Sequence, residues 1–417
     1  MDTLANLLKT EAQRLQYSVL PIHVRRYMPG YIWLKILSAS VAAFKKNSDK
    51  QRVVEILHCL VKQNCHMHAY KGTWYTELAL IQMHHLRDIE SSARVIERAL
   101  NETEHLTQVD KICLLERATK IVNRKTGVTL ITQGLMKQVL SDHNSELLRY
   151  DAPKNIINAM PMPQGTRGSK SIWKIELPGE NKYYGPVELL ALHYYRYNGF
   201  PDGLHCEGAL PITLFVTLFW EEIYGAHVSG AFATQYQIAP SDLFTGEFYA
   251  NRKERIDMKI QSVENLNREE LSLLMENKLK TFGNYRSIMS SSFKCNIFLA
   301  GFPDLFMWNY NSRTVRSYLI NNTKKLFNIS SFSSFFRTKL FAYICMYIIL
   351  KYESLKLLNL YYSFKHKIVE VKGPQDILSM KQRLWMEYLH KIGLDAEVCF
   401  VQGNSYSNLM IYATFQN

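Results

Sequence analysis

The sequence predicts two parts of different fold class, an all-helical N-terminal part and a C-terminal part of mixed α and β structure. Three observations support this division. Apolar residues recur at helical spacing through the first 150 residues. Prolines and glycines then interrupt the pattern between positions 150 and 186. Towards the C-terminus two strand-like runs, an amphipathic helix and a further strand follow one another, an order typical of an α/β core.

Length and composition are those of a folded chain. The 417 residues suggest about two to three domains of roughly 150 residues each. Apolar residues make up 47% and charged residues 21%, which excludes a wholly disordered, collagen-like or disulfide-knot protein. The first residues lack the continuous apolar core of a secretory signal. The longest apolar stretch, residues 340–350, is too short to span a bilayer, so we expect no stable membrane association.

The net charge of +13 favours an anionic partner such as nucleic acid or an acidic membrane. Its distribution weakens that inference. Residues 314–366 carry eight Lys and Arg against one Glu, which gives +7, so the rest of the chain supplies 13 − 7 = +6. More than half of the basicity therefore comes from one segment of unusual composition.

Residues 1–150 predict five amphipathic helices. Apolar positions 33–44 recur at helical spacing, and Ser48 with Gln51 forms a capping-box pattern before a helix over 53–61. Thr73 and Thr107 are placed to begin further helices, with another between them over 89–100. Short connections between such helices favour antiparallel hairpins. The pattern therefore predicts a helical-repeat array without a clean fixed period, an architecture that is more often a binding platform than a catalyst.

One cluster in this part carries metal-binding residue types. It consists of His58, Cys59, Cys65, His66 and His68. Zinc sites usually combine short paired spacings with a longer loop, a spacing that is missing here. The alternative is a buried Cys59 inside a helix with polar residues at the helix end. The seven cysteines, without a C-x-x-C pair, fit a reducing compartment.

Residues 151–186 predict a Pro- and Gly-containing linker with one strand over 172–177, followed by the second domain over 187–417. A helix is expected over 187–198, with Gly199 as its C-cap, and Glu207 opens a further apolar run. Strands are expected at 305–309, 367–371 and 398–401, and a helix over 379–393 joins the last two strands.

The residues that carry chemistry lie on these strands. Asp304 follows a proline at the start of one strand, and Glu370 and Lys372 share one face of the next because strand side chains alternate. Val371 points to the core, but its carbonyl lies at the level of the carboxylates. Two carboxylates and a main-chain oxygen are the hard ligands that Mg²⁺ or Mn²⁺ prefers. A neighbouring ammonium can orient water and balance charge on a phosphate. This is the PD…(D/E)-x-K constellation of metal-dependent nucleases.

The sequence segments around this constellation resemble those of one family. GFPDLFMWN at 301–309, VEVKGPQDILSMKQRLWMEYL at 369–389 and EVCFV at 397–401 strongly resemble the VRR-NUC nuclease domain. The match is extended by HCEG at 205–208 and by two N-terminal segments, RYMPGYIWLKILS at 26–38 and KGTWYTELAL at 71–80. Together they resemble the Fanconi-associated nuclease family. The resemblance implies a TPR-like helical array over residues 1–150 that helps to hold DNA, followed by a restriction-endonuclease-like PD-(D/E)xK domain with a mixed sheet.

The resemblance assigns roles residue by residue. Asp304, Glu370 and Lys372 match the catalytic triad, Glu207 matches an additional metal-binding acid, and the Val371 carbonyl matches a metal-ligand position. Lys111 falls where the family has an Arg of a pocket for a 5′-terminal phosphate. Gln382 lies in the matched segment and is expected either to touch the site or to form a capping box with Ser379.

The resemblance also implies an activity. Such enzymes cleave phosphodiesters at 5′ flaps and in branched or crosslinked DNA with Mg²⁺ or Mn²⁺, in nuclear interstrand-crosslink repair, with proteins of repair complexes as further partners. No cysteine–histidine zinc finger for ubiquitin is recognisable, and residues before 20 leave no room for a separate DNA-binding module. We therefore expect either a truncated product or a minimal member of the family.

Residues 314–366 depart from the family pattern, because a short turn is expected between the two catalytic strands. These 53 residues contain 12 Phe and Tyr but no Gly, Pro or Asp. A retained intron or gene-model error explains this composition best, and a disordered insertion or a membrane-touching helix are alternatives. The insertion raises a second functional hypothesis, a catalytically inactive DNA-binding scaffold whose strands are misaligned. A third is an RNA or membrane binder.

Overall fold

The computed structural model describes residues 2–16, 20–102, 106–143, 150–163, 171–179, 181–205, 215–225, 227–243, 245, 247–266, 268–282, 302–309, 365–391 and 393–403. The chain forms two compact units. The first contains Met1–Arg149 and His227–Asn251, and the second contains Tyr150–Ala226 and Arg252–Asn417. Residues 227–251, expected within the nuclease domain, thus group with the N-terminal helices. The helical part followed by a mixed sheet confirms the predicted fold class.

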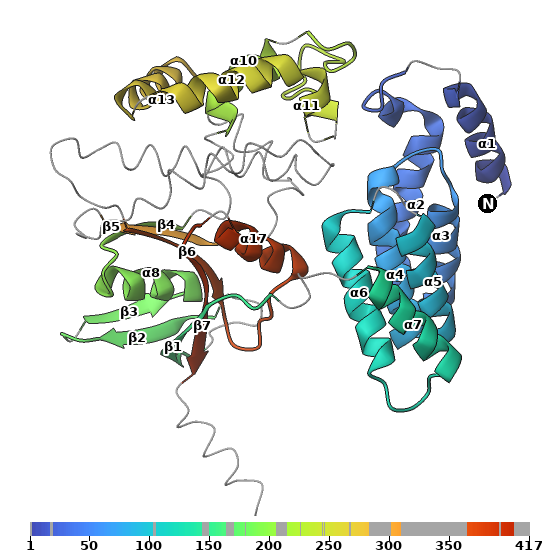
Figure 1. Ribbon diagram of the computed structural model, residues 1–417, viewed down its shortest axis with the longest axis horizontal. Helices are drawn as coiled ribbons and strands as arrows, with labels where there is room; N and C mark the ends of the chain where they lie inside the picture. Colours follow the sequence, from blue (N-terminus) through green and yellow to red (C-terminus); the bar gives the residue numbers. More distant parts are fainter. Residues whose placement is uncertain are drawn as a thin grey trace, which may run out of the picture. The chain divides into compact units, whose positions relative to one another are not determined.

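The described residues of the first unit form helices joined by turns and loops, without a strand (Figure 1). Its longer helices are α1 (Asp2–Gln16), α2 (Pro29–Lys46), α3 (Lys50–Lys62), α4 (Lys71–His84), α5 (Ile89–Glu102), α6 (Gln108–Val122) and α7 (Leu130–Asp142). Three short helices, η1 (Arg25–Tyr27), η2 (His68–Tyr70) and α11 (Glu247–Asn251), complete it. The prediction of five helices missed α1 and α7, whose apolar stripes are interrupted by polar residues.

Caps explain where several of these helices begin. Thr107 caps α6 as predicted, because its side chain accepts from the N–H of Asp110. The expected capping box before α3 is wrong: Ser48 adopts a positive φ of 62°, and Asp49 is the cap that accepts from Arg52 N. Helix α4 begins at Lys71, two residues before the predicted Thr73.

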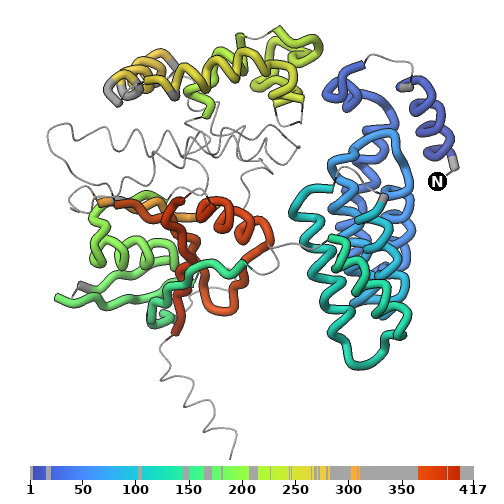
Figure 2. The backbone as a smooth tube through the Cα atoms, viewed as in Figure 1, coloured from blue at the N-terminus to red at the C-terminus, as the bar shows by residue number. Residues whose placement is uncertain are grey.

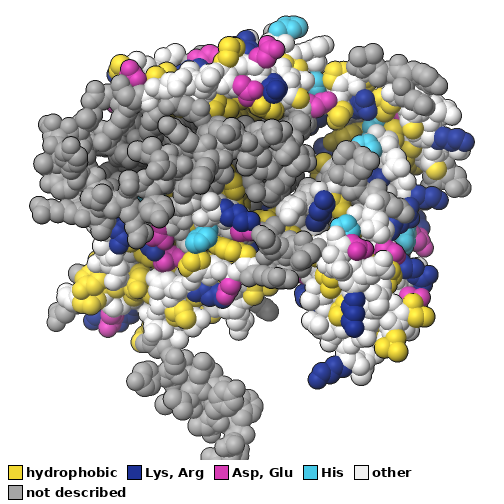
Figure 3. All heavy atoms as spheres, in the orientation of Figure 1, with side chains coloured by type: hydrophobic (Ala, Val, Ile, Leu, Met, Phe, Trp, Pro, Cys, Tyr) yellow, Lys and Arg dark blue, Asp and Glu magenta, His cyan; other side chains and the backbone are white. Residues whose placement is uncertain are grey.

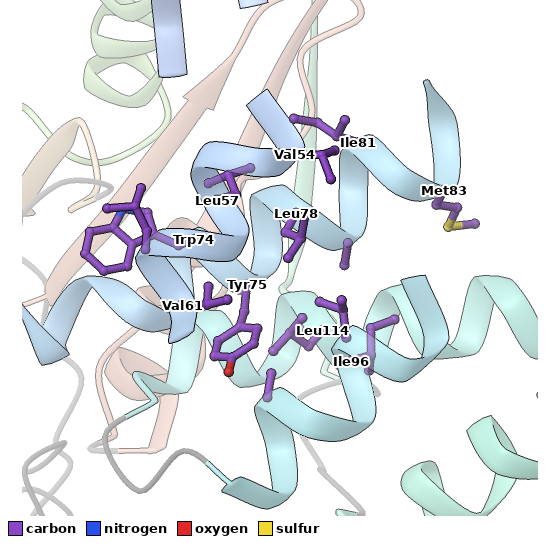
Figure 4. Packing of buried hydrophobic residues seen from close by; sticks show 14 of the residues in the cluster. Val54, Leu57, Val61, Trp74, Tyr75, Leu78, Ile81, Met83, Ile96 and Leu114 are labelled. Atoms are coloured by element: carbon purple, nitrogen blue, oxygen red, sulfur yellow. The ribbon is translucent and has the colours of Figure 1, made fainter. Parts of the chain in front are cut away.

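Apolar side chains from neighbouring helices hold the helical unit together. Leu57 of α3, Leu78 of α4 and Ile96 of α5 are almost fully buried and lie in one cluster (Figure 4). Each helix from α2 to α7 packs on the next one in the sequence. This sequential packing is the arrangement expected of a helical-repeat array.

The second unit is built on a seven-stranded sheet in the order β3-β2-β1-β7-β6-β5-β4. The strands are β1 (Lys154–Pro161), β2 (Trp173–Leu177), β3 (Asn181–Gly185), β4 (Asp202–His205), β5 (Leu305–Asn309), β6 (Lys365–Lys372) and β7 (Ala396–Gly403). The central pairs β1–β7 and β6–β7 are parallel, and the outer pairs are antiparallel. Figure 2 shows the red β7 beside the green β1, although they come from opposite ends of the unit's sequence.

A helix covers each face of this sheet. Helix α8 (Val187–Tyr197) packs Leu190 against Val369 and Val371 of β6 in one apolar cluster. Helix α17 (Met380–Lys391) lies on the opposite face, where Trp385 meets the ring of Phe302 edge-on at a centroid distance of 5.2 Å. Three further helices belong to the unit, α10 (Trp220–Tyr224), α12 (Lys253–Asn265) and α13 (Arg268–Phe282).

Two segments differ from their expected roles. Residues 151–186, expected to be a linker with one strand, supply the three strands β1, β2 and β3, because their alternating apolar positions bury against α8. Strand β6 begins at Lys365, so the last two positions of the expected insertion are strand. The rest of that insertion, residues 314–364, lies outside the described residues. In the described part of the chain, no helix combines the length and apolar character needed to cross a membrane.

Candidate active site at the β5–β6 edge

The pairing of strands β5 and β6 brings Asp304 close to Glu370. Strands β5 and β6 run antiparallel and pair from Leu305↔Val369 to Asn309↔Lys365. Asp304 therefore lies at the end of β5 that meets the last residues of β6. Its Oδ2 accepts a hydrogen bond of 2.8 Å from the backbone N–H of Val371. The strand pairing and this hydrogen bond together hold the Asp304 carboxylate beside residues 370–372.

Successive side chains of β6 point to opposite faces of the sheet, so core side chains lie on one face and candidate site side chains on the other. Val371 is buried in the apolar cluster under α8, whereas Glu370 and Lys372 point to the face of α17. Lys372 Nζ lies 3.0 Å from Glu370 Oε1, and both side chains are largely buried. The sequence prediction that these two side chains share a face is consistent with this contact.

Gln382 reaches the site from the first turn of α17. Its Nε2 donates to Glu370 Oε1, while its Oε1 accepts from the N–H of Ser379 at 2.9 Å. The Gln382 N–H in turn donates to Ser379 Oγ at 3.3 Å. The two expectations for Gln382, capping box and site contact, are therefore both met by one side chain.

Burial dominates the electrostatics of the two carboxyls. The pKa of Glu370 is raised to about 7: burial raises it most, the charge of Asp304 also raises it, and Lys372 and Gln382 oppose the shift. Burial likewise raises the pKa of Asp304, while the Val371 N–H lowers it. Two desolvated carboxyls held next to each other favour a bound proton or a bound cation.

Two further groups act on Asp304 that the sequence reasoning did not single out. The charge of Glu188 raises the Asp304 pKa, and that of His205 lowers it. Glu188 lies in the first turn of α8, and His205 pairs with Leu305 at the end of β4. In sequence Glu188 looks like an ordinary helix-start acid that complements the helix dipole, so no local signal distinguishes it.

The donor set fits a divalent cation of the hard class. Glu370 Oε2 is buried, and among the described residues it has no hydrogen-bond partner. An oxygen in this state is costly unless a proton or cation meets it. Carboxylate oxygens of Glu370 and Asp304 are the ligands that Mg²⁺ and Mn²⁺ prefer.

Two further predicted site residues, Glu207 and Lys111, do not belong to the described part of the sheet unit. Glu207 lies outside the described residues. Lys111 is exposed on α6 of the helical unit, which is a separate unit from the sheet. Basic, acidic and hydrophobic side chains alternate over the face of the helical unit seen in Figure 3.

Comparison with known proteins adds to this geometry. Residues 3–122 match the family described as "Fanconi-associated nuclease 1, TPR domain", and residues 350–403 match the VRR-NUC domain. The two matches fall on the helical array and on β6, α17 and β7. The chain is a relative of the Fanconi-associated nucleases. The resemblance seen in the sequence is thereby confirmed.

Individual Fanconi-associated nucleases align along most of the chain. The protein of Ailuropoda melanoleuca is 26% identical over 428 residues, which cover 95% of this chain and 36% of that protein. The human protein is 25% identical, with 95% of this chain and 36% of that protein covered. The chain thus spans little more than a third of the length of these relatives.

A solved structure shares the fold. The crystal structure of paFAN1 bound to 5′-flap DNA with a gap superimposes with a TM-score of 0.50 at 14% identity, covering 96% of this chain and 62% of that one. At 14% identity, this likeness shows a shared fold and nothing more.

Proposed function

We propose that the chain is a metal-dependent, structure-specific DNA nuclease that hydrolyses phosphodiester bonds at 5′ flaps and in branched or crosslinked DNA. The observation that carries the proposal is the joining of Asp304, Glu370 and Lys372 by the paired ends of β5 and β6. The relatives and the flap-bound fold relative support the choice of substrate class.

In this proposal Asp304 and Glu370 hold the cation, together with the Val371 carbonyl and Glu207. The role of Glu207 rests on the family resemblance. A bound Mg²⁺ or Mn²⁺ would supply Lewis-acid polarisation of the scissile phosphate and a more acidic water. The buried Glu370 oxygen without a partner is the atom that such a cation would satisfy.

Lys372 provides the positive charge of the site. Its ammonium lies 3.0 Å from Glu370 and can hold an attacking water by hydrogen bond while it balances charge that develops on the phosphate. Gln382 orients Glu370, because the amide donates to one carboxylate oxygen and leaves the other free to bind. Hydrolysis adds water across the P–O bond, so the leaving oxygen takes a proton.

The helical unit is proposed to hold DNA beside the nuclease. Lys111, exposed on α6, is assigned to the binding of a 5′-terminal phosphate. Proteins of repair complexes are proposed partners, and the nucleus is the proposed compartment, both by analogy with DNA-repair relatives.

The alternative of an inactive scaffold rested on the expectation that the insertion misaligns the two catalytic strands. The described strands β5 and β6 instead pair over five positions in continuous register. The misalignment that motivated this alternative is thus absent from the described strands, which favours an active enzyme.

The test uses the full chain with Asp304→Ala and Glu370→Ala. We expect cleavage of a 5′-flap substrate in Mg²⁺ or Mn²⁺ to fall at least about a hundredfold, which corresponds to roughly 3 kcal/mol of lost transition-state stabilisation. Binding of the same DNA, measured in a chelator, should persist. Unchanged cleavage would refute the proposed site. A wild-type chain that binds flap DNA but does not cleave it would favour the scaffold.

A further inference from the structure

A second group of metal-ligand residues lies in the helical unit, far in sequence from the carboxylates of the nuclease. Glu11 of α1 meets Cys65 and His66, which follow the end of α3. The three side chains are buried, and one ligand atom of each lies within 4.8 Å of the others. The sequence cluster had contained Cys65 and His66, but Glu11 joins them only through the packing of α1.

The hydrogen bonds hold Glu11 firmly in place. Its Oε1 accepts from the N–H of Gly30 at 3.0 Å, and its Oε2 lies 2.7 Å from His66 Nε2. Gly30 is required for this approach, since a Cβ at that position would lie 2.2 Å from Glu11 Oε2. The carboxylate is thus directed towards Cys65 and His66 by the start of α2.

Burial and an unsatisfied ring nitrogen make this cluster a candidate for a bound cation. The ring Nδ1 of His66 is buried, and among the described residues it has no hydrogen-bond partner. The Cys65 thiol is also buried, and its sulfur lies close to this Glu11–His66 pair. A carboxylate, a thiol and an imidazole thus share one desolvated site.

We propose that Glu11, Cys65 and His66 bind a zinc ion that joins α1 to the α2–α3 hairpin. A carboxylate oxygen, a thiolate and an imidazole nitrogen are all established zinc ligands. With one carboxylate, one thiolate and a neutral imidazole, Zn²⁺ gives a site of zero net charge, which suits burial. Binding forms the Zn–S bond and releases the thiol proton to solvent. The fourth zinc position is then open to water.

The site is independent of the proposed nuclease centre. Asp304 and Glu370 offer only oxygen ligands, so a metal–thiolate bond can come only from a cysteine. Cys59, which is half-buried on α3 six residues before Cys65, provides a matched control.

The experiment titrates the full chain with Co²⁺ as a spectroscopic substitute for zinc. We expect a near-ultraviolet thiolate-to-cobalt charge-transfer band that zinc abolishes. The band should be lost in Cys65→Ser, strongly weakened in His66→Asn and retained in Cys59→Ser. Absence of the band in the wild-type chain, or its persistence in Cys65→Ser, would overturn the proposal.

A second measurement avoids dependence on folding of the variants. Wild-type chain is alkylated with iodoacetamide, with zinc or with a chelator, and modification of each cysteine is quantified by mass spectrometry. Zinc should protect Cys65 several-fold and leave Cys59 labelling unchanged. Equal labelling of Cys65 in both conditions would also overturn the proposal. Neither measurement depends on DNA cleavage.

Discussion

The carboxylate of Asp304 accepts a 2.8 Å hydrogen bond from the backbone N–H of Val371, and this bond joins the start of β5 to the end of β6. The N–H belongs to the residue between Glu370 and Lys372, so one contact positions three chemically active side chains. The pairing of β5 with β6 is long-range in sequence, because 55 residues separate Asn309 from Lys365.

The first prediction concerns those intervening residues. We expect that replacing residues 314–364 by a short Gly- and Asn-containing turn preserves flap cleavage, since the contacts that position the site lie within β5 and β6. Shortening the connection about tenfold should add roughly 2 kcal/mol to the free energy of unfolding by lowering the loop-closure cost. Cleavage assays and denaturant unfolding measure both effects. Cleavage that appears only in the shortened chain would mean that the insertion inactivates the full-length protein.

The second prediction separates the two roles of Gln382. Gln382→Ala removes the donor to Glu370 and should lower metal affinity or cleavage about 10- to 100-fold. Ser379→Ala is the matched control, since it removes the other half of the capping box and should cost only about 1 kcal/mol of stability. Isothermal titration with Mn²⁺ and thermal unfolding distinguish the two variants. Equal losses of Mn²⁺ affinity in both would show that Gln382 acts only as a cap.

The third prediction is a pH dependence of cleavage. Because the Glu370 pKa is raised to about 7, its carboxyl is protonated in slightly acidic solution and cannot hold a cation as carboxylate. Cleavage at limiting Mg²⁺ should therefore rise between about pH 6 and 8. Excess Mg²⁺ should shift the midpoint of this rise to lower pH, because the cation competes with the proton. A flat profile over this range would contradict the assignment of Glu370 as a metal ligand.

The fourth prediction applies the same pKa to stability. The folded pKa lies above the ordinary glutamate pKa of 4.5, so the metal-free folded chain binds more protons than the unfolded chain between these values. Its free energy of unfolding should therefore fall as pH rises from about 4.5 to 7. Asp304, whose pKa is also raised, contributes with the same sign at lower pH. Glu370→Gln should reduce the slope; denaturant melts in a chelator measure it, and an unchanged slope would refute the shift.

The fifth prediction concerns the charge of Lys372. Lys372→Met should nearly abolish cleavage while DNA binding persists, because the ammonium that orients water and balances charge is lost. The same change removes an interaction that lowers the Glu370 pKa, so it should also move Mn²⁺ binding to higher pH. Lys372→Arg, which keeps the charge, should retain the pH profile of Mn²⁺ binding. Full cleavage by the Met variant would exclude the proposed role.

Much of the fold followed from local patterns. The span of β5 and the core of β6 and β7 were predicted because alternating apolar residues bury one face of each strand. Helix α17 was predicted from its capping box and apolar stripe. Ser48 failed as a cap because its backbone turns with a positive φ, and such a turn depends on the neighbouring helices rather than on the tetrapeptide.

The sequence by itself determined the candidate site residues Asp304, Glu370 and Lys372, their order at the two strands and the family resemblance. Only the tertiary structure decided which groups surround them. Gln382, Glu188 and His205 act on the site from three different elements, and Glu11 meets Cys65 and His66 across 54 residues of sequence. The physical reason is that spacing along the chain fixes periodicity and face, whereas desolvation and contact between distant side chains arise only when the elements pack.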